Sequence, residues 1–168
     1  MDSIIIYFSR ADENYFGGTL KYIEKGNTEC LMEKLQEITK SDIFKIIPNV
    51  AYSKDYANCI KEARLDLERN SRPCYKGDID ISKYEVIYLG YPNYWGTIPP
   101  VLMTFLENHN FNGKVIVPIC TNEGSGFGNS KDDILKLASG AKLDMGLEVR
   151  GSLVNSFNVE ESLKKIVR

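Results

Sequence analysis

Hydrophobic and polar positions divide the chain into short apolar runs and longer stretches with a helical period. The runs are rich in Ile, Val, Leu or Tyr and predict five β-strands. These are Ser3–Phe8, Asp42–Ile47, Glu85–Tyr91, Lys114–Cys120 and Leu143–Arg150. Between and after them, apolar residues recur every three or four positions and predict helices around residues 30–38, 56–67, 101–106, 134–138 and 159–166.

Strands that alternate with helices, each strand a continuous apolar run, indicate a parallel sheet covered on both faces. Right-handed crossovers then give an α/β fold, a three-layer αβα sandwich. Residues 1–168 contain no repeat, linker or change of composition, so we expect a single domain. Pro118 lies inside the fourth predicted strand and has no N–H for the ladder. We therefore expect a bulge there, or no neighbouring strand on that side.

Composition and charge exclude several classes of function. The chain is 43% hydrophobic and 26% charged, as in ordinary globular proteins, and its net charge of -2 offers no basic surface for nucleic acid. The apolar run at residues 4–8 is too short to span a membrane and lacks the basic start of a signal peptide, so we expect a cytoplasmic protein. Cys30, Cys59, Cys74 and Cys120 form no C-x-x-C, and with the single His109 they make no metal-ligand pattern. We expect reduced, mostly buried thiols.

Candidate chemistry lies in the loops after the strands, because open parallel sheets bind ligands beyond the carboxyl ends of their strands. The first such loop begins with Ser9 and Arg10 and returns, after a long detour, with Gly26, Asn27 and Thr28 at a predicted helix start. Free N–H groups and the helix dipole favour an anion there by ~0.3–1 kcal/mol. The residue order of a P-loop is absent, because Lys25 precedes Gly26 instead of following it. Hydroxyl and amide donors with little positive charge suit the phosphate of a single monoester. The alternative is that Asn27 or Thr28 only caps the helix.

Two further loops supply an aromatic pair and a polar glycine-rich segment. The loop after the third strand contains Pro92, Asn93, Tyr94, Trp95 and Gly96, and its rings can stack on a planar ligand for ~0.5–1.5 kcal/mol. Alternatively, the tryptophan packs under its own loop. The loop after the fourth strand can hydrogen-bond the edge of a heterocycle, or it is a flexible connector. Its candidate residues are Thr121, Asn122, Glu123, Gly124, Ser125 and Gly126. A helix start that can bind phosphate, an aromatic pair and a polar loop together fit a ligand with a flat ring and a phosphorylated tail, such as FMN.

The segments YFSR, GNT, YLGYPNYWG and CTNEGSGFG occur in an order that resembles the flavodoxin family over essentially the whole chain. The resemblance implies a five-stranded parallel sheet in the order 2-1-3-4-5, with FMN at the switch point between the first and third strands. It also implies that Ser9, Arg10, Asn27 and Thr28 hold the phosphate, and that residues 92–96 and 121–126 flank the isoalloxazine.

The chain departs from the family pattern where ADENYFGGTLKYIEK separates the first strand from Gly-Asn-Thr. In this it resembles a subgroup whose phosphate loop is split by an insertion. We expect the insert, including Tyr15, Phe16, Gly17 and Gly18, to loop over the cofactor or its neighbourhood. Such an insert can turn Arg10 away from the phosphate.

No catalytic side chain and no metal site is predicted, because the chemistry would occur at the flavin N5. Two redox roles stay open: a flavodoxin-type carrier between redox partner proteins, or a small reductase that passes electrons from NAD(P)H to quinones or related acceptors. Carriers of the family tend to be strongly acidic, which the net charge of -2 does not match. Tyr52, Tyr56 and Tyr75 either wall a substrate pocket or serve the core. A non-redox ligand-binding module on the same fold is the alternative of another class. We expect a monomer or weak homodimer.

Overall fold

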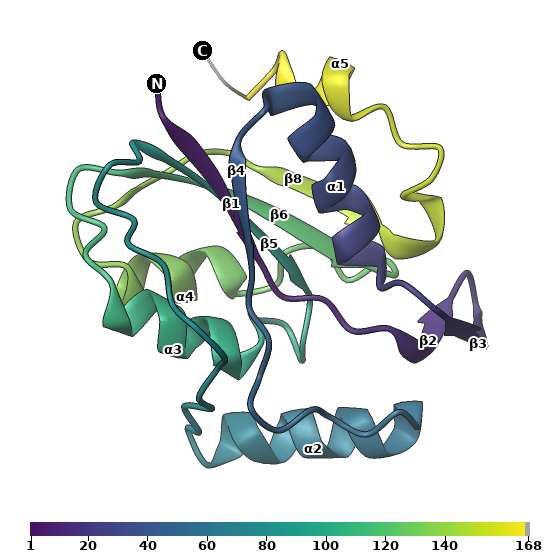
Figure 1. The fold of residues 1–168 in the computed structure, drawn as a ribbon. Helices are drawn as coiled ribbons and strands as arrows, with labels where there is room; N and C mark the ends of the chain where they lie inside the picture. Colours follow the sequence, from purple (N-terminus) through teal and green to yellow (C-terminus); the bar gives the residue numbers. More distant parts are fainter. Residues whose placement is uncertain (167–168) are drawn as a thin grey trace.

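A computed structural model describes residues 1–166 as a central sheet with helices on both faces (Figure 1). The strands of the main sheet are β1 (Ser3–Tyr7), β4 (Asp42–Lys45), β5 (Val86–Pro92), β6 (Val115–Asn122), β7 (Lys142–Leu143) and β8 (Leu147–Arg150). Strands β2 (Asp12–Phe16) and β3 (Thr19–Ile23) form a separate hairpin. The helices are α1 (Asn27–Thr39), α2 (Tyr56–Glu68), α3 (Pro100–Asn108), α4 (Ser130–Leu137) and α5 (Val159–Leu163), with a 3-10 turn η1 (Gly151–Leu153).

The main sheet is parallel and has the order β4-β1-β5-β6-β7, with β8 also beside β6. β7 and β8 are the two halves of the predicted fifth strand. Leaving out the hairpin and counting these halves together, the order is 2-1-3-4-5. The predicted fold class is therefore confirmed, whereas the prediction of one unbroken fifth strand is wrong.

The break in the fifth strand lies opposite Pro118. Register pairs run from Ile116–Leu143 to Ile119–Leu147, so residues 144–146 of the outer strand stand opposite only two residues of β6. Ile116 O still accepts the N–H of Asp144 (2.9 Å), but Pro118, two residues further, has no N–H to offer the same neighbour. The extra residue therefore lies in the neighbour of β6, whereas the bulge expected in β6 itself is not seen.

Two apolar layers hold the helices to the sheet. On one face, Ile5 and Tyr7 pack with residues 31–35 of α1 and with α5; on the other, Ile4 and Ile6 pack with α3 and α4. Each large side chain buried in these layers contributes ~1.5–3 kcal/mol. The helical period places Cys30, Leu31, Leu35 and Ile38 on one face of α1, but Met32 is buried and Ile38 is 42% exposed, so the buried face is slightly rotated from this pattern.

Helix α2 belongs to neither layer. It lies beyond the carboxyl ends of the strands, at the bottom of Figure 1, and only Cys59 and Ala63 of its 13 residues are buried. The helical period places Tyr56, Ile60, Ala63 and Leu67 on one face of α2, and of these Ala63 is buried and Leu67 packs against the core, whereas Tyr56 and Ile60 are only partly buried. Helix α2 closes the end of the sheet at which the sequence predicts a ligand.

The insertion after β1 is the hairpin β2–β3. Its strands pair from Asp12–Ile23 to Phe16–Thr19, and Gly17 and Gly18 form the two-residue turn with φ of +62° and +98°. Glycine is preferred there because such a turn needs positive φ at both positions. The hairpin stands at the right of Figure 1, near the amino end of α2.

The expectation for the cysteines is met only in part. Cys59 and Cys120 are buried, but Cys74 is exposed and Cys30 is intermediate, so the thiols are not mostly buried. His109 donates from Nδ1 to Phe105 O (2.8 Å) at the carboxyl end of α3. Within residues 1–166, no group of His, Cys, Asp and Glu is placed to hold a metal ion. None of the helices in that range is long and apolar enough to span a bilayer.

Candidate functional site

A cavity of about 460 Å³ opens at the carboxyl ends of β1, β5 and β6, where the sequence predicts the ligand. This volume falls within the ~300–1,000 Å³ of typical small-molecule sites. The predicted residues that line it are Arg10, Asn27, Pro92, Asn93, Tyr94, Trp95, Gly96, Thr121, Asn122, Glu123 and Ser125. Ser9, Gly26, Thr28, Gly124 and Gly126 lie outside the lining set, in the same loops.

The start of α1 is pressed against the end of β1. Gly26 is its N-cap, and a Cβ there would overlap Ser9 Oγ and lie 2.7 Å from the carbonyl oxygen of Arg10. Glycine is therefore required for this close approach. The N–H of Glu29 donates to Ser9 Oγ (3.1 Å), while among the described residues those of Asn27 and Thr28 have no acceptor. These two amides, at the positive end of the helix dipole, remain for an anion.

Behind this corner, two buried threonines share a hydrogen bond. Thr28 Oγ1 and Thr121 Oγ1 are 2.8 Å apart, and the two side chains are 2% and 4% exposed. Thr121 also lines the cavity, so the pair connects the first turn of α1 with the end of β6. Thr28 does not cap the helix, since no side-chain cap hydrogen bond is present at this helix start.

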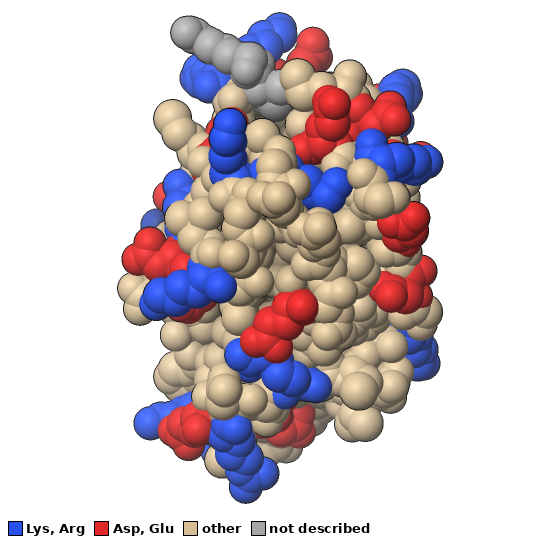
Figure 2. Space-filling view, turned by 90° about the vertical axis from the view of Figure 1, so that its left-hand side faces the viewer, with Lys and Arg blue, Asp and Glu red and all other residues tan. Residues whose placement is uncertain are grey.

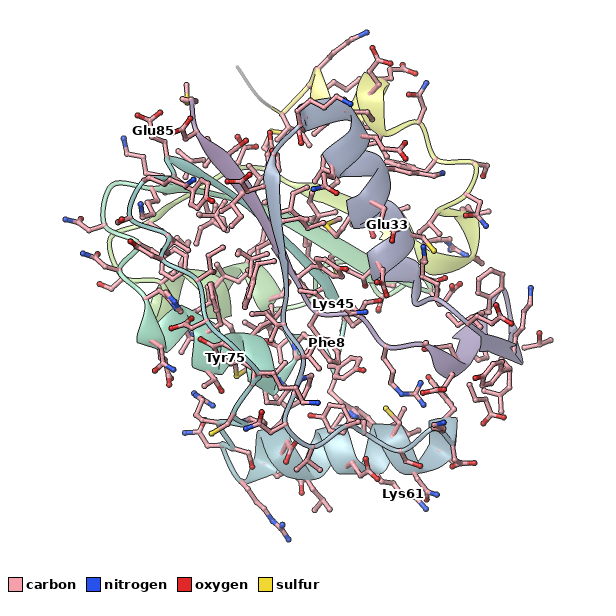
Figure 3. All side chains as sticks on the ribbon, viewed as in Figure 1. Phe8, Glu33, Lys45, Lys61, Tyr75 and Glu85 are labelled. Atoms are coloured by element: carbon pink, nitrogen blue, oxygen red, sulfur yellow. The ribbon has the colours of Figure 1, made fainter. Side chains whose placement is uncertain are left out.

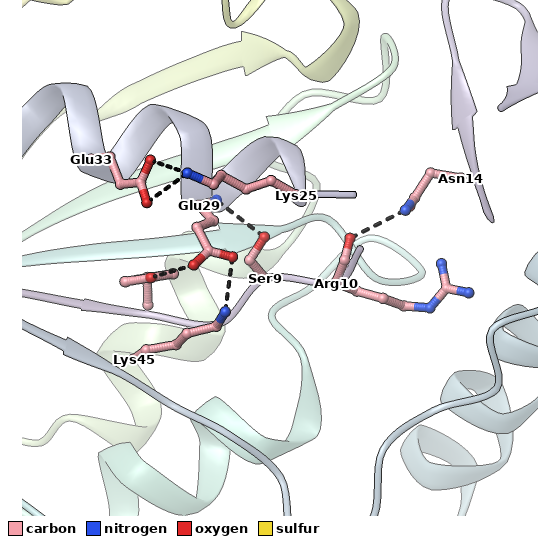
Figure 4. A network of polar contacts seen from close by, with 8 residues as sticks. Ser9, Arg10, Asn14, Lys25, Glu29, Glu33 and Lys45 are labelled. Atoms are coloured by element: carbon pink, nitrogen blue, oxygen red, sulfur yellow. Dashed lines mark hydrogen bonds and ion pairs between the residues drawn. The ribbon is translucent and has the colours of Figure 1, made fainter. Parts of the chain in front are cut away.

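A charge network flanks the start of α1 (Figure 4). Glu29 accepts hydrogen bonds from Lys45 (2.8 Å) and from the hydroxyl of Tyr7 (3.3 Å). Burial, and then the nearby Glu29, raise the pKa of Tyr7 well above its usual range. Lys25 pairs with Glu33 at 2.7 Å on the outer side of the helix. Glu29 of the first turn and Glu33 of the next are thus each paired with a lysine, which limits their repulsion of a phosphate.

Arg10 does not point at the start of α1. Figure 4 shows its guanidinium directed away from the helix, and it donates to the carbonyl oxygens of Glu13 (2.6 Å), Ser53 (2.7 and 3.2 Å) and Lys54 (2.9 Å). The prediction that Arg10 holds the phosphate does not fit this conformation. The hairpin supplies one of these acceptors, the carbonyl of Glu13, and the segment before α2 supplies the other two, the carbonyls of Ser53 and Lys54.

The loop after β5 is a tight two-residue turn. Tyr94 and Thr97 exchange both backbone hydrogen bonds (2.9 and 3.1 Å), and Trp95 and Gly96 between them have φ of +54° and +84°. A positive φ is common for glycine but strained for a bulky residue, at a cost of order 1–3 kcal/mol. The turn therefore holds Trp95 in place at the expense of local stability.

The two aromatic side chains of this turn have different surroundings. The indole Nε1 of Trp95 donates to Ile60 O (2.9 Å) and Arg64 lies over the ring at 5.3 Å, so Trp95 packs on α2 rather than under its own loop. Tyr94 lies against Phe8, with ring centroids 5.9 Å apart, and burial raises its pKa well above the usual range. Figure 3 shows Phe8 between the end of β1 and α2. Tyr94 is thus a neutral phenol, and both rings border the cavity.

The loop after β6 is cross-linked rather than a flexible connector. Asn93 donates from Nδ2 to Gly126 O (2.8 Å) and from its backbone N–H to Thr121 O (2.9 Å), which ties this loop to the β5 turn. The carboxylate of Glu123 accepts the backbone N–H (2.8 Å) and the hydroxyl (3.1 Å) of Ser152. These bonds fix the polar groups that face the cavity.

Several lining residues were missing from the predicted site. They are Asn14 of the hairpin, Tyr56, Cys59, Ile60 and Ala63 of α2, and Gly151 of η1. Of the insert residues expected near the cofactor, Tyr15 lines the cavity, whereas Phe16, Gly17 and Gly18 are not among its lining residues. Tyr56 was considered only as one of three tyrosines that could wall a pocket. Of the other two, Tyr52 hydrogen-bonds Asp66 and Tyr75 packs on Phe105, outside the cavity. The alternation of DENYF and TLKYI around Gly-Gly is a hairpin signal that could have indicated Asn14.

Gly151 has no such local signal. A Cβ there would overlap the side-chain amide of Asn27 and lie 3.0 Å from the Glu123 carboxylate, so any larger residue requires the Asn27 side chain to move. The residue is distant in sequence from both neighbours, and its role depends on how η1 packs against α1.

Comparison with known proteins identifies relatives of this fold. A sequence model described as flavodoxin matches residues 20–168, and no protein with a curated description matches the chain. A candidate flavoprotein from Bacteroides eggerthii DSM 20697 is 25% identical, with a TM-score of 0.69 and coverage of 92% of this chain and 94% of that one. A candidate flavoprotein from Bacteroides uniformis ATCC 8492 is 20% identical, with a TM-score of 0.72 and coverage of 97% of each chain. A flavoprotein from Lactobacillus acidophilus NCFM, solved in complex with FMN, is 18% identical, with a TM-score of 0.65 and coverage of 92% and 97%.

Proposed function

Since the chain belongs to the flavodoxin family, we propose that it is an FMN-binding redox protein that transfers electrons through the flavin. The observation that carries this proposal is the cavity itself. It joins the amides at the start of α1 to the aromatic turn after β5 and the polar loop after β6. FMN has a phosphate at one end and a flat ring at the other, and the donors and rings of the cavity match these two ends. A protein of similar fold has been solved in complex with FMN.

Different residues of the cavity would bind the two ends of FMN. The amides of Asn27 and Thr28, with the hydroxyl of Ser9, would hold the phosphate, while Tyr94 and Trp95 would flank the ring. FMN, when bound, supplies the hydride and electron chemistry at its ring. The protein decides what reaches the ring and how readily the ring gains negative charge.

Two features near the cavity would make negative charge on a bound flavin ring less favourable. The carboxylate of Glu123 lies beside Asn27 and is fixed by Ser152, and it disfavours additional negative charge nearby. The apolar wall of Ile60 and Ala63 excludes water and acts in the same direction.

Two observations favour a reductase of small acceptors as a second candidate. Helix α2 and the hairpin stand along the cavity and narrow the approach for a protein partner. The net charge of -2 and the mixed acidic and basic side chains on the face in Figure 2 also lack the strongly acidic field of a carrier. A nicotinamide donor and a quinone-type acceptor would then be the partners.

The test of the proposal is to incubate the purified protein with excess FMN, remove free flavin and record the absorbance spectrum. A yellow protein with a stoichiometric flavin spectrum supports the proposal. A colourless protein contradicts both redox roles and leaves the non-redox ligand-binding module. With flavin bound, rapid NAD(P)H oxidation in the presence of a quinone indicates the reductase, and photoreduction that stops after one electron indicates the carrier.

A further inference from the structure

The guanidinium of Arg10 connects two segments that are far apart in sequence. Its Nη1 donates to Glu13 O in the hairpin, while Nε and Nη2 donate to Ser53 O and Nη2 also to Lys54 O, just before α2. The carbonyl oxygen of Arg10 accepts the side-chain amide of Asn14 (3.1 Å). Arg10 therefore hydrogen-bonds both the hairpin and the segment that leads into α2.

Glu13 completes this connection from the hairpin side. Its backbone N–H donates to Lys54 O (3.2 Å), and its carboxylate accepts the N–H of Tyr56 (3.1 Å) in the first turn of α2. The rings of Tyr15 and Tyr56 are stacked, with centroids 6.5 Å apart and planes 29° apart. Hairpin and helix thus meet through both polar and aromatic contacts.

The connection matters because α2 has little apolar anchorage of its own. Only Cys59 and Ala63 of its 13 residues are buried, whereas α3 buries seven of nine. Figure 3 shows Lys61 on the side of α2 that faces away from the sheet. Elements with few buried apolar contacts open at the lowest free energy, so polar contacts at the amino end of α2 decide its position.

The same elements form one wall of the cavity. Asn14 and Tyr15 of the hairpin line it together with Tyr56, Cys59 and Ile60 of α2. None of these groups is needed to bind the phosphate at the start of α1. They stand on the side of the cavity where Trp95 hydrogen-bonds Ile60.

We propose that Arg10 is a positioning residue that closes this wall over the flavin ring by tying the hairpin to the start of α2. The wall retains the ring of the cofactor, and the phosphate is held elsewhere, by the α1 amides. The inference rests on the proposed function, because it concerns how a bound flavin is retained. It assigns the insertion a role in flavin retention.

FMN and riboflavin together distinguish the two possible roles of Arg10, since they share the ring and differ in the phosphate. Arg10→Gln should weaken both flavins by the same factor, about tenfold, because hydrogen bonds from a charged donor are lost from the wall. Their dissociation rates should rise in parallel, because changes in affinity fall mostly on dissociation. The control Arg69→Gln makes the same chemical change at the exposed C-cap of α2 and should leave both affinities unchanged.

Two results would overturn the role proposed for Arg10. A loss for FMN with none for riboflavin would make Arg10 a phosphate ligand and overturn the proposal, as would unchanged affinity and dissociation for both flavins. Should Arg10→Gln fail to fold, Glu13→Gln weakens the same connection at Tyr56 and should raise both dissociation rates by a smaller factor. A wild-type protein that binds neither flavin would contradict the proposed function, which is a separate result.

Discussion

Replacing Thr28 by valine tests the corner where α1 begins, because valine keeps the shape of threonine and removes its hydroxyl. In the folded protein that hydroxyl is 2.8 Å from the hydroxyl of Thr121, and the two residues are 2% and 4% exposed. Neither hydroxyl has another hydrogen-bond partner among the described residues. Valine leaves the hydroxyl of Thr121 buried and unpaired.

The expected cost follows from this geometry. An unpaired buried hydroxyl destabilises a protein by about 1–3 kcal/mol, and 1 kcal/mol lowers the melting temperature of a chain of this size by roughly 2–4 °C. Thr28→Val should thus melt roughly 2–12 °C below the wild type. Thr121→Val should cost a similar amount. The double variant should cost less than the sum, because neither hydroxyl is then left without a partner.

The assay is urea unfolding of the flavin-free wild type, both single variants and the double variant. Thr28→Ser, which keeps the hydroxyl, is the control and should retain more stability than Thr28→Val. Two single costs that simply add, or a Thr28→Val variant as stable as the wild type, would refute the reasoning about this pair.

Thr28→Val also tests whether the start of α1 binds the phosphate of FMN. While Thr121 donates to Thr28, Thr28 can donate to a phosphate oxygen, so Thr28→Val should weaken FMN by about 1–3 kcal/mol. Riboflavin, which lacks the phosphate, should bind Thr28→Val as it binds the wild type. An unchanged ratio of FMN to riboflavin affinity would show that Thr28 serves only the protein.

Three further predictions address other positions. Gly26→Ala should destabilise the protein by about 1–3 kcal/mol and weaken FMN binding, because the added Cβ would overlap Ser9 Oγ. Urea denaturation and FMN titration measure the two effects, and a variant with unchanged stability and affinity would contradict the close contact between Gly26 and residues 9–10. Trp95→Gly should be about 1 kcal/mol more stable than Trp95→Ala, since both lose the indole but only glycine suits φ of +54°; equal stabilities in urea would argue against strain. Burial raises the pKa of Cys120 from 9.0 to about 12, so the folded state favours the neutral thiol and this stabilisation should be lost as pH rises from about 9 to 12. At pH 8, iodoacetamide should label exposed Cys74 and spare Cys120, which mass spectrometry of the native protein would show; rapid labelling of Cys120 would contradict its burial.

The sheet and its ligand edge could be predicted from the sequence because both depend on local patterns. Continuous apolar runs such as residues 3–8 become buried parallel strands, and the carboxyl ends of such strands share one edge. The glycine before Asn27 and Thr28 also marks a helix start locally. These signals need no knowledge of distant contacts.

The rest of the site depends on contacts between segments far apart in sequence. Amphipathic spacing in α2 predicts a helix but does not say that it lies across the end of the sheet rather than on its face. Gly151 meets Asn27 only after η1 has packed against α1. The direction of Arg10 is set by carbonyls at positions 53 and 54, which no local pattern relates to it.

The central claim is that the start of α1 holds the phosphate of FMN while the aromatic turn and α2 hold its ring. A crystal structure of the FMN-loaded protein tests this most directly. The account predicts phosphate oxygens within hydrogen-bond distance of the N–H groups of Asn27 and Thr28, with the ring between Tyr94 or Trp95 and the α2 wall. A phosphate bound away from those two amides, or a ring outside this cavity, would contradict it.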